Sequence, residues 1–232
     1  MSHTPLFILP GLLEDADAFE EVIGGLQEMA TTTVADLTRA ETIADLARAA
    51  LEQAPAGSFA LAGHSMGGYV ALEIMRQAPQ RVARLALLNT HARPDTPEST
   101  ANRRRLMELA DRDFEAVINA LMPKLMTEAH LKDPILTGII GAMALATGKD
   151  AFKRQERAII ARIDSRPHLA AIRCPTLVVA ARDDQLMPVE ILEELSHGIR
   201  GARLAVVEEC GHMASIEQPA VVTGLLREWI AG

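Results

Sequence analysis

Gly63-His64-Ser65-Met66-Gly67-Gly68 is the stretch that decides the fold of this chain. An apolar run at residues 58–62 precedes it, and a helix-like stretch at residues 69–75 follows it. A G-x-S-x-G pattern between a strand and a helix is typical of a serine held on a sharp turn, where glycines avoid Cβ clashes. The helix behind the serine directs free N–H groups and a positive dipole end at the same point. This turn therefore suits chemistry in which an oxyanion forms beside an attacked carbonyl.

The composition indicates a globular protein without a nucleic-acid or membrane partner. The 232 residues are 49% hydrophobic and 23% charged, which favours one α/β domain of ordinary size. A formal net charge of -8 argues against binding to nucleic acid or to an anionic membrane. The weakly polar run at residues 135–146 is too short to span a bilayer.

Two further features favour a cytoplasmic location. Met1-Ser2-His3-Thr4-Pro5 leads directly into a strand and lacks the features of a signal peptide. The only cysteines, Cys174 and Cys210, are expected at opposite ends of the sheet and therefore as reduced thiols.

Short apolar runs alternate with helical patterns along most of the chain. This alternation predicts a mostly parallel sheet that is covered by helices on both faces. The predicted strands are residues 6–9, 32–35, 58–62, 85–88, 176–180 and 204–207, and helical patterns occupy residues 16–29, 42–53 and the stretch that ends near 78.

The long segment between the fourth and fifth strands is predicted to be helical. Its clearest pattern places apolar residues on one helix face, namely Phe114, Val117, Ile118, Leu121, Met122 and Leu125. Because the segment leaves the sheet at the edge where open α/β sheets bind ligands, we interpret residues 91–172 as a helical cap. Residues 1–90 and 173–232 then form the core. The alternative is a helical subdomain that does not contact substrate.

A serine nucleophile needs a base and a group that orients the base. Asp183 and Asp184 follow the predicted fifth strand, and His212 follows the sixth, so both loops share the sheet edge with Ser65. Among seven histidines, His212 alone combines a glycine neighbour with this position. The remaining histidines are interpreted as surface residues (His3, His130, His168, His197), as packing or turn support pointing away from the groove (His64), or as a residue of the substrate groove or the cap hinge (His91).

The whole chain resembles the α/β-hydrolase superfamily, in the branch of small capped serine hydrolases. The resemblance rests on residues 63–68, on residues 175–179 with the aspartate pair and Pro188, and on Gly211-His212 followed by Glu217-Gln218-Pro219. This branch includes carboxylesterases, enol-lactonases, cofactor-free haloperoxidases and enzymes that cleave carbon–carbon bonds in diketones. It implies the α/β-hydrolase fold with about six strands, because the usual first two strands are missing here.

The resemblance also assigns site residues. Relatives carry the catalytic acid four residues before the loop proline, so Asp184 rather than Asp183 is implied, counting back from Pro188. The oxyanion would be bound by the backbone N–H groups of Leu12 and Met66. Relatives often have His-Gly where this chain has Pro10-Gly11. Substrate-lining residues are expected at Leu13, His91, Met187 and Met213.

The predicted function is hydrolysis of a small ester, thioester or lactone through an acyl-enzyme on Ser65, Asp184 and His212. The alternatives are carbon–carbon bond hydrolysis or perhydrolysis with the same triad, and a ligand-binding receptor on a hydrolase scaffold. We expect a small-molecule substrate, an aliphatic pocket and no metal or cofactor, while the oligomeric state stays open. Arg103-Arg104-Arg105 could hold an acidic substrate, but we interpret it as a solvated helix face.

Overall fold

The computed structural model describes residues 3–232, so Met1 and Ser2, at the start of the predicted core, lie outside the described residues. Six strands form one sheet in the order β2-β1-β3-β4-β5-β6, and every neighbouring pair is parallel. The six-stranded parallel sheet that the sequence predicts is therefore confirmed. The strands are β1 (Thr4–Leu9), β2 (Ala30–Val34), β3 (Phe59–His64), β4 (Val82–Leu88), β5 (Thr176–Ala181) and β6 (Arg203–Val207).

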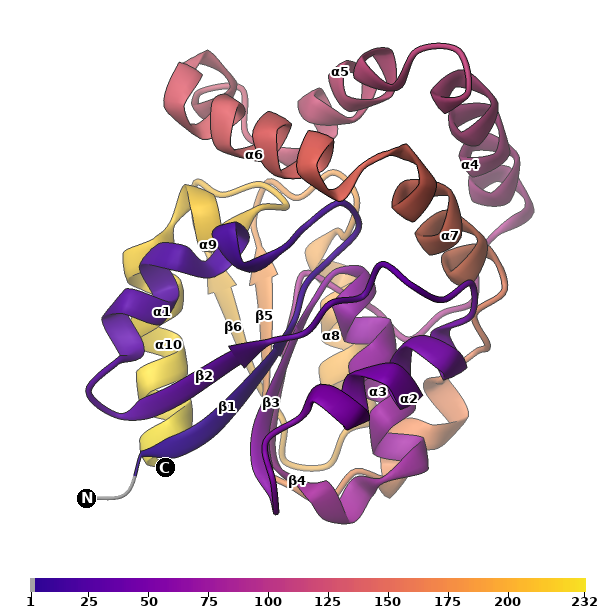
Figure 1. Ribbon diagram of the computed structural model, residues 1–232. Helices are drawn as coiled ribbons and strands as arrows, with labels where there is room; N and C mark the ends of the chain where they lie inside the picture. Colours follow the sequence, from indigo (N-terminus) through magenta and orange to yellow (C-terminus); the bar gives the residue numbers. More distant parts are fainter. Residues whose placement is uncertain (1–2) are drawn as a thin grey trace.

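Helices cover both faces of the sheet, as Figure 1 shows. Alternate residues of the strands pack into two separate apolar clusters, because successive side chains of a strand point to opposite faces. One cluster includes Phe7 and Leu61 and is covered by α2 (Ile43–Gln53), α3 (Met66–Gln77) and α8 (Val189–Gly198). The other includes Ile8 and is covered by α1 (Glu20–Leu26) and α10 (Pro219–Ala231). Neither α8 nor α10 is among the helices predicted from the sequence.

Four helices between β4 and β5 form the segment that the sequence analysis interprets as a cap. They are α4 (Pro97–Ala110), α5 (Phe114–Leu125), α6 (Pro134–Thr147) and α7 (Lys149–Ile160). In Figure 1 they lie together beyond the carboxyl ends of the strands. The predicted amphipathic helix is confirmed as α5, and its buried Val117 and Ile118 belong to a third apolar cluster. That these helices act as a substrate cap, with boundaries at 91 and 172, stays a prediction.

The remaining short elements are 3-10 turns and one short helix. They are η1 (Ala16–Phe19), η2 (Pro79–Arg81), η3 (His130–Lys132), η4 (Arg166–Ala171) and α9 (Ala214–Glu217). Both cysteines are free thiols: Cys174, before β5, is half-buried, and Cys210, after β6, is buried.

Membrane-spanning helices were sought among residues 3–232. No single helix there is long and apolar enough to cross a bilayer, and α6 with α7 meets the criteria only as a pair bent by 89°.

Candidate active site

Ser65 occupies the turn between β3 and α3 with a left-handed backbone conformation, φ +50°. A non-glycine residue there stores roughly 1–3 kcal/mol of strain, which only tight surroundings sustain. The surroundings are tight because glycines let the backbones approach. A Cβ on Gly63 would lie 2.5 Å from the carbonyl oxygen of Gly67, and one on Gly68 would collide with Thr90. The turn predicted from the glycines is therefore present, and it exposes the Ser65 hydroxyl to a cavity.

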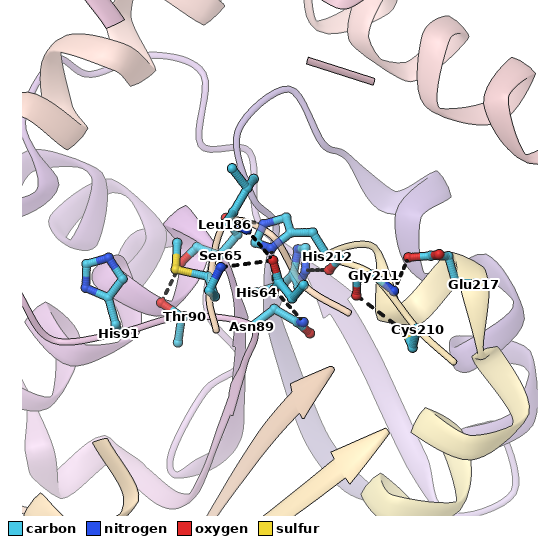
Figure 2. Close-up of polar contacts among 12 residues, drawn as sticks. His64, Ser65, Asn89, Thr90, His91, Leu186, Cys210, Gly211, His212 and Glu217 are labelled. Carbon is cyan, nitrogen blue, oxygen red and sulfur yellow. Dashed lines mark hydrogen bonds and ion pairs between the residues drawn. The ribbon is translucent and has the colours of Figure 1, made fainter. Parts of the chain in front are cut away.

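A line of hydrogen bonds connects Ser65 to the loops that follow β5 and β6. The Ser65 Oγ lies 2.9 Å from His212 Nε2, and His212 Nδ1 lies 2.8 Å from Asp184 Oδ2. Figure 2 shows His212 beside Ser65 at the carboxyl edge of the sheet. The structure thus brings together three of the side chains that the sequence analysis selected.

Asp184 rather than Asp183 faces His212. Asp184 is 4% exposed, and its Oδ1 accepts hydrogen bonds from the backbone N–H groups of Leu186 and Met187, at 2.8 and 2.9 Å. Asn89 donates a further bond to its Oδ2, at 3.0 Å. Burial alone raises the pKa of this carboxyl, but the charge of His212 and the hydrogen bonds outweigh burial and lower the pKa to about 2. Asp183 is exposed.

The backbone around His212 is held by Glu217, whose role the sequence analysis did not identify. Glu217 accepts hydrogen bonds from the Gly211 N–H at 2.9 Å and from the Thr127 N–H at 2.9 Å. It also contacts His130 Nδ1 at 2.8 Å. His130, interpreted from the sequence as a surface residue, has a side chain that is 26% exposed and is paired with Glu217, 87 positions further along the chain.

The loop after β1 borders the same cavity as Ser65 through Leu12 and Leu13. Neither the Leu12 N–H nor the Met66 N–H has a hydrogen-bond acceptor among residues 3–232. The flanking N–H groups are bonded: Gly11 donates to Glu14 Oε2 at 2.7 Å, and Leu13 donates to Gln155 Oε1 at 3.1 Å. The loop is thus anchored on either side of its unpaired donor.

His64 is a buried histidine that joins this loop to the histidine loop. Its Nε2 lies 2.9 Å from the carbonyl oxygen of His212, and its Nδ1 lies 2.8 Å from Glu14 Oε1. The carbonyl oxygen is an acceptor, so Nε2 carries a proton. Burial lowers the pKa of His64, but the Glu14 carboxylate more than offsets this and leaves the pKa raised. The predicted turn support has a partner, Glu14, that sequence reasoning missed.

The Ser65 hydroxyl opens into a cavity of about 520 Å³. The four predicted lining residues, Leu13, His91, Met187 and Met213, all border it. One wall is aliphatic, as the sequence analysis expects, and is built largely by α5 and α6 with Ile118, Leu121, Leu125, Ile140, Met143 and Ala144.

The cavity is also lined by four charged residues whose pairing was not predicted from the sequence, namely Asp95, Arg103, Glu156 and Arg162. Arg103 binds Glu156 at 2.7 Å and Asp95 at 3.3 Å, and Arg162 binds Asp95 at 2.9 Å. The Arg103 side chain is only 21% exposed, so its interpretation as part of a solvated helix face is wrong. The reason is tertiary, because Glu156 is supplied by α7, 53 residues further on. Among residues 3–232, no group of three or more His, Cys, Asp or Glu side chains could hold a metal ion.

Comparisons with known proteins agree with the fold. The sequence profile of the alpha/beta hydrolase family matches residues 9–225. RutD of Variovorax paradoxus, provisionally named a carbamate hydrolase, is 29% identical over 93% of this chain and 83% of its own length. A thermophilic esterase from Thermogutta terrifontis superposes with a TM-score of 0.90 at 28% identity, over 99% of this chain and 90% of that one. An enol-lactonase from Burkholderia xenovorans has the same fold, with a TM-score of 0.90 at 22% identity over 100% and 93% of the two chains.

Proposed function

The chain belongs to the alpha/beta hydrolase family, and on that premise we propose that it is a serine hydrolase of small carboxylic esters, thioesters or lactones. One observation carries this proposal. Ser65 Oγ, His212 and Asp184 form a continuous line of hydrogen bonds of 2.9 and 2.8 Å. The Leu12 and Met66 N–H groups, which have no acceptor within residues 3–232, belong to the segments that follow β1 and β3 at the carboxyl edge of the sheet. Nucleophile, base, orienting acid and oxyanion donors are the groups that acyl transfer requires.

The first half of the reaction acylates the serine. As Ser65 Oγ bonds to the carbonyl carbon, His212 Nε2 takes the hydroxyl proton and the π pair moves to the carbonyl oxygen. The Leu12 and Met66 N–H groups bind that oxyanion. When the tetrahedral intermediate collapses, the leaving group departs with the proton from His212, and the acyl group stays on Ser65.

The second half repeats these steps with water. His212 takes a proton from water, whose oxygen bonds to the acyl carbon, and the Ser65 oxygen leaves with that proton. Asp184 stays ionised throughout, since its pKa of about 2 lies far below neutrality. It therefore holds the Nδ1–H of His212 in place and stabilises each imidazolium.

The chemistry of the cavity favours a small substrate with an aliphatic part. A carbamate is the second candidate, because the relative that covers 93% of this chain is provisionally named a carbamate hydrolase. A carbamate carbonyl is attacked by the same nucleophile and bound by the same oxyanion donors. Carbon–carbon bond hydrolysis is kept as a third possibility by a 29% identical relative, the 2-hydroxy-6-oxo-6-phenylhexa-2,4-dienoate hydrolase of Comamonas testosteroni, which aligns over 68% of this chain and 57% of its own length.

The test is a substrate panel combined with active-site labelling. We expect steady turnover of p-nitrophenyl esters of graded chain length, with lactones, thioesters and carbamates run alongside. A serine-directed fluorophosphonate should label Ser65 alone, and Ser65→Ala should lower turnover by about 10^6-fold. Labelling that survives Ser65→Ala would refute the proposal. A single turnover with retained ligand would instead favour a receptor.

A further inference from the structure

Tyr69 lies one helical turn after Ser65 on α3 and borders the same cavity. Its side chain is held between two neighbours. The Arg162 guanidinium lies 4.6 Å from the centre of the phenol ring, and the His91 ring lies 5.3 Å from it, centre to centre. Tyr69 is 5% exposed, so its hydroxyl is nearly excluded from bulk water.

The hydrogen bonds of His91 determine the direction of its hydrogen bond with the Tyr69 hydroxyl. The Arg93 backbone N–H donates to His91 Nδ1 at 3.0 Å, so Nδ1 carries no proton. A neutral ring then carries its proton on Nε2, which lies 3.3 Å from the Tyr69 oxygen. Burial and the charge of Arg162 lower the pKa of His91 to about 3, which keeps the ring neutral. His91 therefore donates and the Tyr69 oxygen accepts.

The phenolic proton of Tyr69 has no acceptor among the residues that the structure describes. None of the hydrogen bonds among residues 3–232 uses Tyr69 as a donor, although its oxygen is already engaged by His91. A buried donor without an acceptor costs roughly 1–3 kcal/mol. Tyr69 borders the same cavity as Ser65. Its hydroxyl is therefore suited to donate a hydrogen bond to an acceptor atom of a molecule that enters this cavity.

We propose that Tyr69 determines substrate specificity by donating a hydrogen bond to a second oxygen of the substrate, apart from the reacting carbonyl. This inference rests on the proposed function, because the Leu12 and Met66 N–H groups already receive the reacting oxygen. Figure 2 shows His91 and His212 on opposite sides of Ser65. A substrate that reaches both the oxyanion donors and Tyr69 is held at two points.

The charges around Tyr69 favour a neutral oxygen. Arg103 and Arg162 are balanced by Asp95 and Glu156, with which they form ion pairs. A carboxylate placed there would therefore meet no net positive charge. A hydroxyl, keto or ether oxygen accepts a hydrogen bond without adding charge, so the proposed substrate class is a small hydroxy-, oxo- or alkoxy-substituted ester, thioester or lactone.

The experiment compares matched esters on the wild type and on Tyr69→Phe, which removes only the hydroxyl. Methyl butyrate lacks the second oxygen, methyl 3-hydroxybutyrate and methyl 3-oxobutyrate carry it on the acyl side, and 2-hydroxyethyl butyrate carries it on the leaving group. At least one oxygen-bearing ester should exceed methyl butyrate in kcat/KM by about tenfold in the wild type. Tyr69→Phe should remove that advantage while changing methyl butyrate by less than about threefold.

Two controls separate specificity from damage. Ser196→Ala removes a buried hydroxyl on α8, outside the cavity, and should leave the ratio unchanged. Fluorophosphonate labelling of Ser65 should proceed equally in the wild type and in Tyr69→Phe, which reports an intact nucleophile.

The outcomes distinguish this inference from the function it rests on. If methyl butyrate is hydrolysed and Ser65 is labelled, but no substrate ratio changes in Tyr69→Phe, the role of Tyr69 is refuted and the hydrolase stands. A larger Tyr69-dependent advantage for monomethyl succinate than for the neutral esters would refute the neutral class. An absence of turnover and of labelling would overturn both proposals.

Discussion

The loops at the carboxyl edge of the sheet and the helices α4–α7 both line one cavity. They differ in how completely their polar atoms are hydrogen-bonded and in how many large apolar side chains they expose. In the loops, Asp184 receives four hydrogen bonds and Glu14 binds both the Gly11 N–H and His64. In the helices, one carboxylate oxygen of the buried Glu156 has no partner within the described residues, and Ile135 and Leu145 of α6 are 70% and 51% exposed.

This difference suggests that the loops serve catalysis and that α4–α7 serve substrate selection. The proposed catalytic groups must keep one geometry, and hydrogen bonds from several chain segments hold them there. The helices contribute apolar contacts and a network of ion pairs in which one Glu156 oxygen has no partner within the described residues. Such a surface is suited to select a substrate. Substitutions in the loops should therefore remove kcat or stability, and substitutions in α4–α7 should have weaker effects.

The largest expected effect is on Asp184 in the loop after β5. Asp184→Asn should lower kcat by about 10^3 to 10^4, because His212 loses the acceptor that fixes its Nδ1 proton. The matched control is Asp183→Asn, which should cost about tenfold or less, since Asp183 is exposed. The kcat values of the two variants are compared by steady-state kinetics, after circular dichroism has shown that both are folded. A greater loss for Asp183→Asn would reverse the assignment.

A second prediction concerns the buried pair of Glu14 and His64. Glu14→Ala should lower the free energy of unfolding by about 3–5 kcal/mol, because it leaves the buried His64 ring without the carboxylate that its Nδ1 contacts. Glu14→Gln should restore most of this loss, since an amide can still bridge Gly11 and a neutral ring. Urea unfolding measures both. Glu41→Ala, which breaks an ion pair with Arg157 on the surface, should change stability little. Equal losses for Glu14→Ala and Glu41→Ala would contradict the buried-pair interpretation.

The third prediction is a pH dependence that comes from His91. Its folded pKa of about 3 lies below the ordinary value of 6.5, so the unfolded chain binds a proton that the folded chain does not. The contribution of the neutral His91 ring to the free energy of unfolding is therefore complete above pH 6.5. It falls as the pH drops toward 3, by up to about 1.4 kcal/mol per pH unit. Urea midpoints between pH 4 and 7 should show this slope in the wild type.

The variant His91→Gln should flatten that slope, and His197→Gln should leave it unchanged because His197 is exposed. The charged groups near His91 are Arg93, Arg103, Arg162 and Asp95. An unchanged slope in His91→Gln would show that this ring is not held neutral in the folded protein.

The smallest expected effect is on the exposed face of α6. Ile135→Ser should change the free energy of unfolding by about 0.5 kcal/mol or less, since the side chain is 70% exposed. Thermal unfolding measures the change, and sedimentation velocity gives the oligomeric state. A large loss of stability, or a change in the sedimentation coefficient, would show that this face is covered in solution.

Much of the fold could be predicted because its signals are local. Apolar runs closed by turn residues placed the six strands, with small errors at their ends, as for β2, which begins at Ala30 rather than Thr32. The one-face pattern of residues 114–125 predicted α5. Part of the candidate site could also be predicted from the sequence, because Ser65 and His212 lie in short motifs that come directly after predicted strands.

What the sequence by itself determined is the turn around Ser65, the alternation of strands and helices, and the order of the loops that carry Asp184 and His212. The tertiary structure alone decided the partners: Glu14 for His64, 50 residues apart, Glu156 for Arg103, 53 residues apart, and His91 for Tyr69, 22 residues apart. The physical reason is one of range. Backbone sterics and side-chain periodicity act over a few residues and leave a pattern, whereas a buried ion pair or a histidine tautomer depends on which distant groups the packed chain brings within 3 Å or so.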